Sequence, residues 1–291
     1  MTGPCVQITC ESELRPISLS VIRSTVRSAV LRCAPGLAHA YRLMRDRRVA
    51  VAPPVQTSFG FTLAGNKRLA NGHHEEAEIG VFLGLIERAS VCVDIGANIG
   101  LYTCVAASRG KHVLAVEPLA RNLELLYRNI EANNFTEVEV FPLGLTSRTG
   151  VERIYGFGMG ASLIQGWAGS LRNSYKLVAV STLDLILNSR FVGLPLLIKM
   201  DVEGLELEVL KGAAQTLGMN PRPKWIVEIC LNEHFPGGQN DKFCETFETF
   251  WRCGYKTSIA DGEQRVVGQG DVLRWARLGR VDFGSHNYLF C

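Results

Sequence analysis

The chain has 291 residues, of which 47% are hydrophobic and 20% charged, a balance typical of a globular protein with a sizeable core. Its 31 basic and 28 acidic residues give a net charge of +3, which argues against a nucleic-acid-binding protein. The nine cysteines include no C-x-x-C pair, and no apolar run approaches a membrane span. We therefore expect a reduced, cytoplasmic protein.

The first 56 residues are predicted to form an arginine-rich helical extension. Eight arginines and a single acid, Asp46, lie between Arg15 and Arg48. Apolar residues repeat on one helical face from Ile22 to Cys33, with arginines on the other side. The simplest interpretation is an accessory helix packed on the main domain. The alternative is peripheral contact with an anionic membrane surface or an acidic partner.

Residues 57–291 are predicted to form the main α/β domain. After a turn-rich hairpin or loop at 49–66, apolar strands alternate with amphipathic helices. This alternation indicates a doubly wound, mostly parallel sheet with helices on both faces. The expected strands are 91–94, 112–117, 138–143, 196–201, 225–230 and a closing 287–290, and the expected helices are 75–88, 99–109, 119–133, 205–217 and 242–253. Residues 151–190 break the alternation and are expected to be an insertion near one rim.

The turn after the first expected strand, in "VCVDIGANIGLYT", predicts a ligand that contains a nucleoside. Asp94 ends the strand, and Gly96 and Gly100 frame the turn. In doubly wound sheets, ligands bind beyond the carboxyl ends of the strands, where the amides of the next helix can bind a negative group. Glu117 follows 23 residues after Asp94, a spacing suited to accepting hydrogen bonds from ribose hydroxyls. A tight structural turn and a surface acid are the alternative without a ligand.

Asn98 bears on which nucleoside is bound. In the dinucleotide fingerprint G-x-G-x-x-G, the second glycine lets a pyrophosphate approach, and Asn98 holds that place here. The Asp94 carboxylate also opposes a pyrophosphate, whereas it suits a ligand that carries an ammonium group. S-adenosylmethionine combines such a group with a ribose. The turn therefore favours methyl transfer over hydride transfer.

Five segments resemble the FkbM-type family of S-adenosylmethionine-dependent methyltransferases. They are "VDIGANIGLYT", "AVEP" (115–118), "STLDLIL" (181–187), "IKMDVEGLELEVLKGA" (198–213) and "PKWIVEI" (223–229). The resemblance covers about residues 57–230. It implies a class I methyltransferase (Rossmann-like) fold, with a seven-stranded, mostly parallel sheet and an antiparallel final hairpin. It also implies O-methylation of a hydroxyl, often on a sugar or a secondary metabolite.

The resemblance further implies which residues hold the cofactor. Its amino-acid end would be lined by Asp94, Gly96, Asn98 and Gly100. Glu117 would hold the ribose, and the residues from Leu143 to Thr146 would lie near the adenine. Asp201 is counted both here and among the catalytic candidates.

The catalytic candidates stand at the ends of two further strands. They are Asp201, Glu203, Glu228 and His234. A hydroxyl acceptor must be placed close to the methyl donor and must lose its proton. We expect Asp201 and Glu203 to orient the acceptor and His234 or Glu228 to accept the proton, without a metal. The alternative is Mg²⁺ held by these carboxylates, because the set lacks the Cys/His ligands of a zinc site.

The sequence therefore predicts a cytoplasmic O-methyltransferase that uses S-adenosylmethionine to modify a sugar, a glycan or a secondary metabolite. The alternatives are an NAD-dependent oxidoreductase on a similar fold and a non-catalytic cofactor-binding module. A decayed module would be expected to have lost some of the acids at the strand ends. The balanced charge argues against a nucleic-acid substrate, and the acceptor and the oligomeric state are left open.

Overall fold

The structure of the protein is a computed structural model that describes residues 53–65, 76–156 and 158–291. The helices expected within 17–49 and the first residue of the helix expected at 75–88 lie outside these ranges. The domain boundary expected after residue 56 also stays a prediction. Among the described residues, no helix combines the length and the apolar character needed to cross a membrane.

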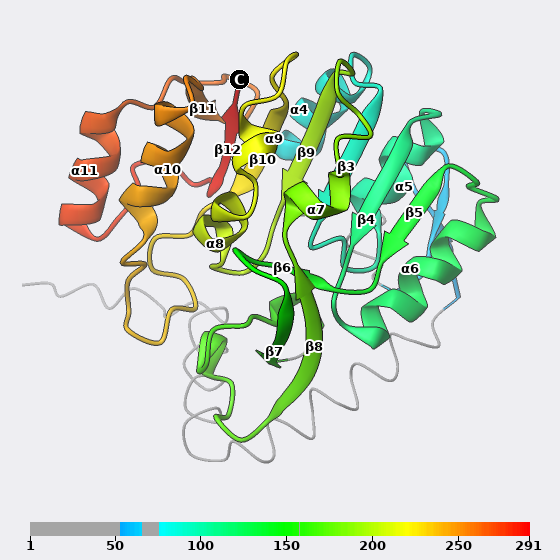
Figure 1. Ribbon diagram of the computed structural model, residues 1–291, viewed down its shortest axis with the longest axis horizontal. Coiled ribbons are helices and arrows are strands. Elements are labelled where there is room, and N and C mark those ends of the chain that lie inside the picture. Colours follow the sequence, from blue (N-terminus) through cyan, green and yellow to red (C-terminus); the bar gives the residue numbers. More distant parts are fainter. Residues whose placement is uncertain (1–52, 66–75, 157) are drawn as a thin grey trace, which may run out of the picture. The chain divides into compact units, whose positions relative to one another are not determined.

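The centre of the domain is a seven-stranded sheet (Figure 1). In spatial order its strands are β11 (Thr257–Ile259), β12 (Asn287–Phe290), β10 (Lys224–Glu228), β9 (Leu196–Met200), β3 (Val91–Ile95), β4 (His112–Val116) and β5 (Val138–Phe141). The strands from β10 to β5 are parallel, and β12 is antiparallel to both its neighbours. This mostly parallel sheet with an antiparallel final pair confirms the class I methyltransferase fold.

The strands are buried on both faces, which explains why they read as continuous apolar runs. In β3, Val91, Val93 and Ile95 face one core, and Cys92 faces the other. Residues from five helices belong to the first core: α7 (Leu183–Leu187), α8 (Glu206–Lys211), α9 (Ala214–Leu217), α10 (Phe243–Arg252) and α11 (Gln269–Leu278). The second core includes residues from α4 (Glu76–Ile86), α5 (Leu101–Ser108) and α6 (Ala120–Ala132).

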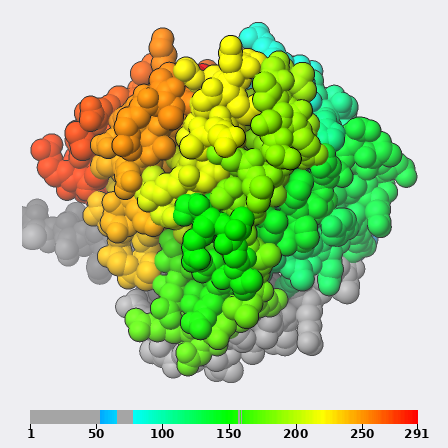
Figure 2. Space-filling view, viewed as in Figure 1, coloured from blue at the N-terminus to red at the C-terminus, as the bar shows by residue number. Residues whose placement is uncertain are grey.

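The insertion expected at 151–190 contributes to a separate three-stranded sheet. Its central strand, β8 (Tyr175–Ser181), pairs in parallel with β6 (Gly144–Leu145) and in antiparallel with β7 (Gly150–Tyr155). This small sheet, coloured green, lies below the central strands in Figure 1 and reaches the surface on the face shown in Figure 2. It therefore provides side chains close to the carboxyl ends of the main strands.

Three local expectations can be compared with the structure. The hairpin expected within 49–66 is formed by β1 (Val55–Gln56) and β2 (Thr62–Leu63). The strand expected at 138–143 ends at Phe141. The helix expected at 205–217 is two helices, α8 and α9. At the break between them, an added Cβ on Gly212 would lie 2.3 Å from the Thr146 carbonyl oxygen, so the close packing requires a glycine there.

Candidate active site

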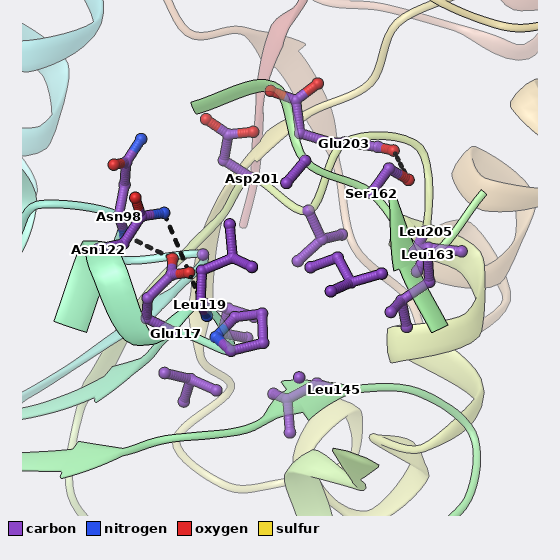
Figure 3. Close-up of a pocket in the computed structure, with 18 of the residues that line it drawn as sticks. Asn98, Glu117, Leu119, Asn122, Leu145, Ser162, Leu163, Asp201, Glu203 and Leu205 are labelled. Carbon is purple, nitrogen blue, oxygen red and sulfur yellow. Dashed lines mark hydrogen bonds between the residues drawn. The ribbon is translucent and has the colours of Figure 1, made fainter. Parts of the chain in front are cut away.

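An open cavity of about 610 Å³ lies where the carboxyl ends of β3, β4 and β9 meet the small sheet (Figure 3). The chain order of the strands reverses between β3 and β9, and doubly wound sheets bind ligands at such a point. The polar side chains in the lining are Asn98, Glu117, Asn122, Ser162, Asp201 and Glu203, and the apolar ones include Leu143, Leu145, Leu163 and Leu205.

Glu117, which directly follows β4, is the most strongly bound acid of the lining. Its Oε2 accepts the backbone N–H of Asn98 at 2.9 Å, and its Oε1 accepts the backbone N–H of Leu119 at 2.9 Å and the Asn122 side chain at 3.1 Å. Burial raises the pKa of Glu117 to about 7, against these three hydrogen bonds. A carboxylate has about four acceptor positions, so these three donors leave one for a ligand.

The turn between β3 and α5 brings the backbone of two strands together. Gly96 has a φ of +83°, and a Cβ at this position would lie 1.8 Å from the carbonyl oxygen of Asp201. The glycine is therefore required by the close approach of the turn to the end of β9. Asn98 follows with a φ of +54°, and its buried Oδ1 has no hydrogen-bond partner in the described part of the chain. Gly100 lies behind the turn against Leu126 and is not part of the lining.

Asp94 is not among the residues that line the cavity. It is 2% exposed, and its Oδ2 accepts a 2.6 Å hydrogen bond from the Thr103 hydroxyl of α5. Burial raises the pKa of Asp94 to about 6, while this hydrogen bond opposes the shift. The structure thus places Asp94 where it ties β3 to α5, and does not include it among the lining residues.

Only some residues of the segment 143–146, which was expected near the adenine, line the cavity. Leu143 and Leu145 line the cavity, and Figure 3 shows Leu145 on the side away from Asp201. Thr146 is not in the lining, because its hydroxyl turns to the backbone and donates to the Arg148 carbonyl at 2.9 Å. The apolar wall is therefore formed by the leucines of this segment.

Glu203, another acid of the lining, is held through both its backbone and its side chain. Its backbone has a φ of +55°, a conformation that a residue with a side chain adopts at a cost. The indole N–H of Trp167 donates to its Oε2 at 3.0 Å, and the Ser162 hydroxyl donates to its carbonyl at 2.7 Å. Burial and the neighbouring Asp201 raise the pKa of Glu203 to about 8. The segment after β7 thus fixes Glu203 at the cavity edge.

Asp201 and Glu228 form a carboxyl pair next to Glu203. The charge of Asp201 is the main cause of a pKa of Glu228 well above its usual range, followed by burial. Asp201 lines the cavity and Glu228 does not. Glu228 can therefore act on a bound molecule only through its neighbour in this arrangement.

His234, expected as a proton acceptor, is an exposed residue in the loop after β10. Its ring meets the edge of the Trp167 ring, with centroids 5.8 Å apart, and its backbone has a φ of +70°. It is not part of the cavity lining. The structure thus connects His234 to the acid cluster through Trp167.

Side chains that could bind a metal ion lie close together outside the cavity. Among the described residues, the set that places three potential ligand atoms within 4.8 Å of one another is Cys230, Glu233 and His286. Asp201, Glu203 and Glu228 do not form such a set. The geometry therefore gives no support to the Mg²⁺ alternative at these carboxylates.

Two features of the site were not found from the sequence. Asn122 and Trp167 both bind acids of the lining. The contact between Asn122 and Glu117 could have been predicted from the sequence, because Asn122 lies only five residues after Glu117, at the start of the next helix. The contact between Trp167 and Glu203 spans 36 residues and leaves no local pattern.

Comparison with known proteins shows which family the chain is similar to. The family model described as "Methyltransferase FkbM domain" matches residues 94–257. The hexuronic acid methyltransferase AglP of Haloferax volcanii is 31% identical over 152 residues, which are 52% of this chain and 61% of AglP. The chain therefore matches less than two thirds of the length of that relative.

The solved structures that the chain is similar to are more distant in sequence. Precorrin-6y C5,15-methyltransferase of Geobacter metallireducens has a TM-score of 0.39 and 12% identity, with 68% of this chain and 79% of that chain covered. The cofactor-bound Rv0187 from MTB has a TM-score of 0.38 and 14% identity, with 95% and 97% covered. Because both TM-scores are below 0.5, the assignment of the fold comes from the sheet order.

Proposed function

Because the chain belongs to the FkbM methyltransferase family, we propose that it uses S-adenosylmethionine to methylate a hydroxyl group of a sugar or a glycan. The observation that supports the proposal most is a single cavity lined by Glu117 on one strand end and by Asp201 and Glu203 on another. The printed name of the Haloferax relative, a hexuronic acid methyltransferase, supports a sugar as the acceptor.

The residues of the cavity fit S-adenosylmethionine. Glu117 keeps one acceptor position for a ribose hydroxyl, and the unpartnered Oδ1 of Asn98 is suited to an ammonium donor. Leu143 and Leu145 supply apolar surface for a base. When bound, this cofactor would supply an electrophilic methyl group on a positively charged sulfur.

Glu203 is the residue that we assign to removal of the acceptor proton. The Trp167 N–H holds Oε2 of Glu203, which leaves Oε1 to receive a proton. A pKa of about 8 makes the ionised carboxylate a better base than an ordinary glutamate, because basicity follows the pKa. Asp201, which also lines the cavity, would accept a second hydrogen bond from the acceptor and so orient it.

Calorimetric titration with S-adenosylhomocysteine and, in parallel, with NAD⁺ tests the cofactor. We expect saturable binding of S-adenosylhomocysteine alone, because Asn98 takes the place of the glycine that would admit a pyrophosphate. Binding of NAD⁺ alone would support an oxidoreductase, and binding of neither would contradict the cofactor assignment.

The acceptor is tested with a labelled methyl donor and two sets of oligosaccharides, one neutral and one containing hexuronic acid. We expect a labelled product that survives mild base, because an ether formed at a hydroxyl is stable there. A label released by mild base would instead indicate a methyl ester at the carboxyl group. Absence of label from every saccharide would contradict a sugar acceptor.

Replacement of Glu117 tests the cofactor site directly. We expect Glu117→Gln to weaken S-adenosylhomocysteine binding roughly 10- to 100-fold, because a hydrogen bond to a charged group contributes about 1.5–3 kcal/mol. In the wild type the affinity should rise as the pH rises through about 7, where the Glu117 carboxyl ionises. Glu139→Gln, at an exposed acid of β5 that binds Arg190 at 2.9 Å, is the matched control. Equal dissociation constants for both variants would contradict this role of Glu117.

A further inference from the structure

A cluster outside the cavity has the donor set of a transition-metal site. Cys230 and Glu233 lie in the loop after β10, and His286 directly precedes β12. The two segments are held together by the sheet, because β10 pairs with β12 and the Ile229 N–H donates to the His286 carbonyl at 2.8 Å. Potential ligand atoms of the three side chains lie within 4.8 Å of one another.

The types of the three potential ligands indicate which metal ions the cluster would bind. A thiolate, an imidazole and a carboxylate suit zinc and similar borderline metals, whereas Mg²⁺ and Ca²⁺ prefer oxygen ligands alone. His286 Nε2 and Glu233 Oε1 are 3.4 Å apart, a separation that two ligands of one ion can have. Cys230 and His286 are half-buried and Glu233 is exposed, so an ion could enter from solvent.

An unsatisfied polar atom next to the cluster is an independent indication of a missing ligand. The Tyr288 hydroxyl is fully buried and has no hydrogen-bond partner in the described part of the chain. Cys230 and Glu233 are near enough to this hydroxyl to raise its pKa, although burial is the larger cause. A buried polar group left unpaired is costly, and a water molecule on a bound ion would supply a partner for it.

We propose that Cys230, Glu233 and His286 bind one zinc-type divalent ion. Three protein ligands leave a fourth position of the ion for water. The Cys230 thiol, which donates to Glu228 Oε1 at 3.6 Å, would release its proton to solvent when it binds the ion as a thiolate. The site would connect the loop after β10 with the start of β12, next to the carboxyl pair of Glu228 and Asp201. This inference does not depend on the identity of the methyl acceptor or of the cofactor.

Titration of the metal-free protein with Co²⁺ tests the proposal without any methyl-transfer assay. We expect one equivalent to bind with a thiolate-to-cobalt charge-transfer band that Zn²⁺ removes by competition. Cys230→Ser should lose the band, and Cys253→Ser should keep it as the matched cysteine control. His286→Gln should weaken binding at least about tenfold, while His112→Gln should leave it unchanged.

The outcomes distinguish metal binding at this site from metal binding at other cysteines and from misfolding of a variant. If the wild type and Cys230→Ser give the same band, the ion is bound elsewhere and the proposal is wrong. Absence of any thiolate band in the wild type would also overturn it. Thermal melting of each variant in the absence of metal shows whether the fold is intact, and His286→Gln gives a second reading if Cys230→Ser does not fold.

Discussion

Glu203→Gln is expected to lower kcat about 10²- to 10⁴-fold and to leave the affinity for S-adenosylhomocysteine nearly unchanged. The amide has the shape of the carboxyl group and can still accept the Trp167 N–H, but it cannot take up the acceptor proton. Because Glu203 lines the cavity and Glu117 holds the ribose in our proposal, turnover and cofactor affinity should separate. Steady-state kinetics and calorimetry on the same preparation measure both.

The pH profile tests the same role of Glu203. The pKa of Glu203 is about 8, above the usual value of a glutamate, so the carboxyl group is mostly protonated at pH 7 and ionised above pH 8. A base must be ionised to act, so kcat of the wild type should rise as the pH rises through about 8. Glu203→Gln should lose this rise.

Two further variants serve as controls. Glu208→Gln changes an acid of α8 that binds Ser147 and Lys242 at the surface, and it should leave kcat within the error of the wild type. Trp167→Phe keeps the ring but removes the N–H that favours the ionised form of Glu203, so the rise in kcat should move to higher pH. Wild-type turnover in Glu203→Gln, or an equal loss of cofactor affinity, would contradict the assignment.

The sequence was sufficient for the fold because the strands and helices carry strong periodic signals. Buried strands read as apolar runs, and the acids at their ends mark one edge of a parallel sheet. The prediction that Asp94 lines the cofactor cavity is not supported by its position, and strand length explains why. The strand was expected to end at residue 94, but β3 continues through Ile95. Asp94 is therefore still inside the strand, where successive side chains point to opposite faces of the sheet. Its side chain points away from the face of Val93 and Ile95 and toward α5.

The rest of the site depends on contacts between distant parts of the chain. Trp167 reaches Glu203 because the segment after β7 folds back over the end of β9, and neither sequence segment indicates that contact. His234 follows β10 in the chain, as the sequence analysis noted, but its loop directs the ring to Trp167. Spacing can place a residue at an edge of the sheet, whereas the direction of its side chain depends on the loop that carries it.

The buried ion pair between Lys199 and Glu78 is expected to make a large contribution to the stability of the fold. Lys199, the fourth of the five residues of β9, is 2% exposed, and its Nζ lies 3.1 Å from Oε1 of Glu78 in α4, which is 5% exposed. The ammonium group also donates to Asn287 Oδ1 at 3.4 Å and lies 5.3 Å from the centre of the Tyr102 ring. Its charge further lowers the pKa of Asp94, the residue opposite it in β3, against the effect of burial.

Lys199→Met is therefore expected to lower the free energy of unfolding by about 3–5 kcal/mol, because it leaves the buried charge of Glu78 without its partner. Denaturant unfolding should show a lower midpoint with an unchanged slope. The double variant Lys199→Met with Glu78→Met should recover part of the loss, and the cycle gives the coupling energy of the pair. Lys211→Met, at an exposed lysine that binds Glu208 at 3.1 Å, should cost less than about 0.5 kcal/mol. If both lysine variants were equally stable, the ion pair would contribute no more than a surface contact, and the arrangement of the acids around β9 would have to depend on packing alone.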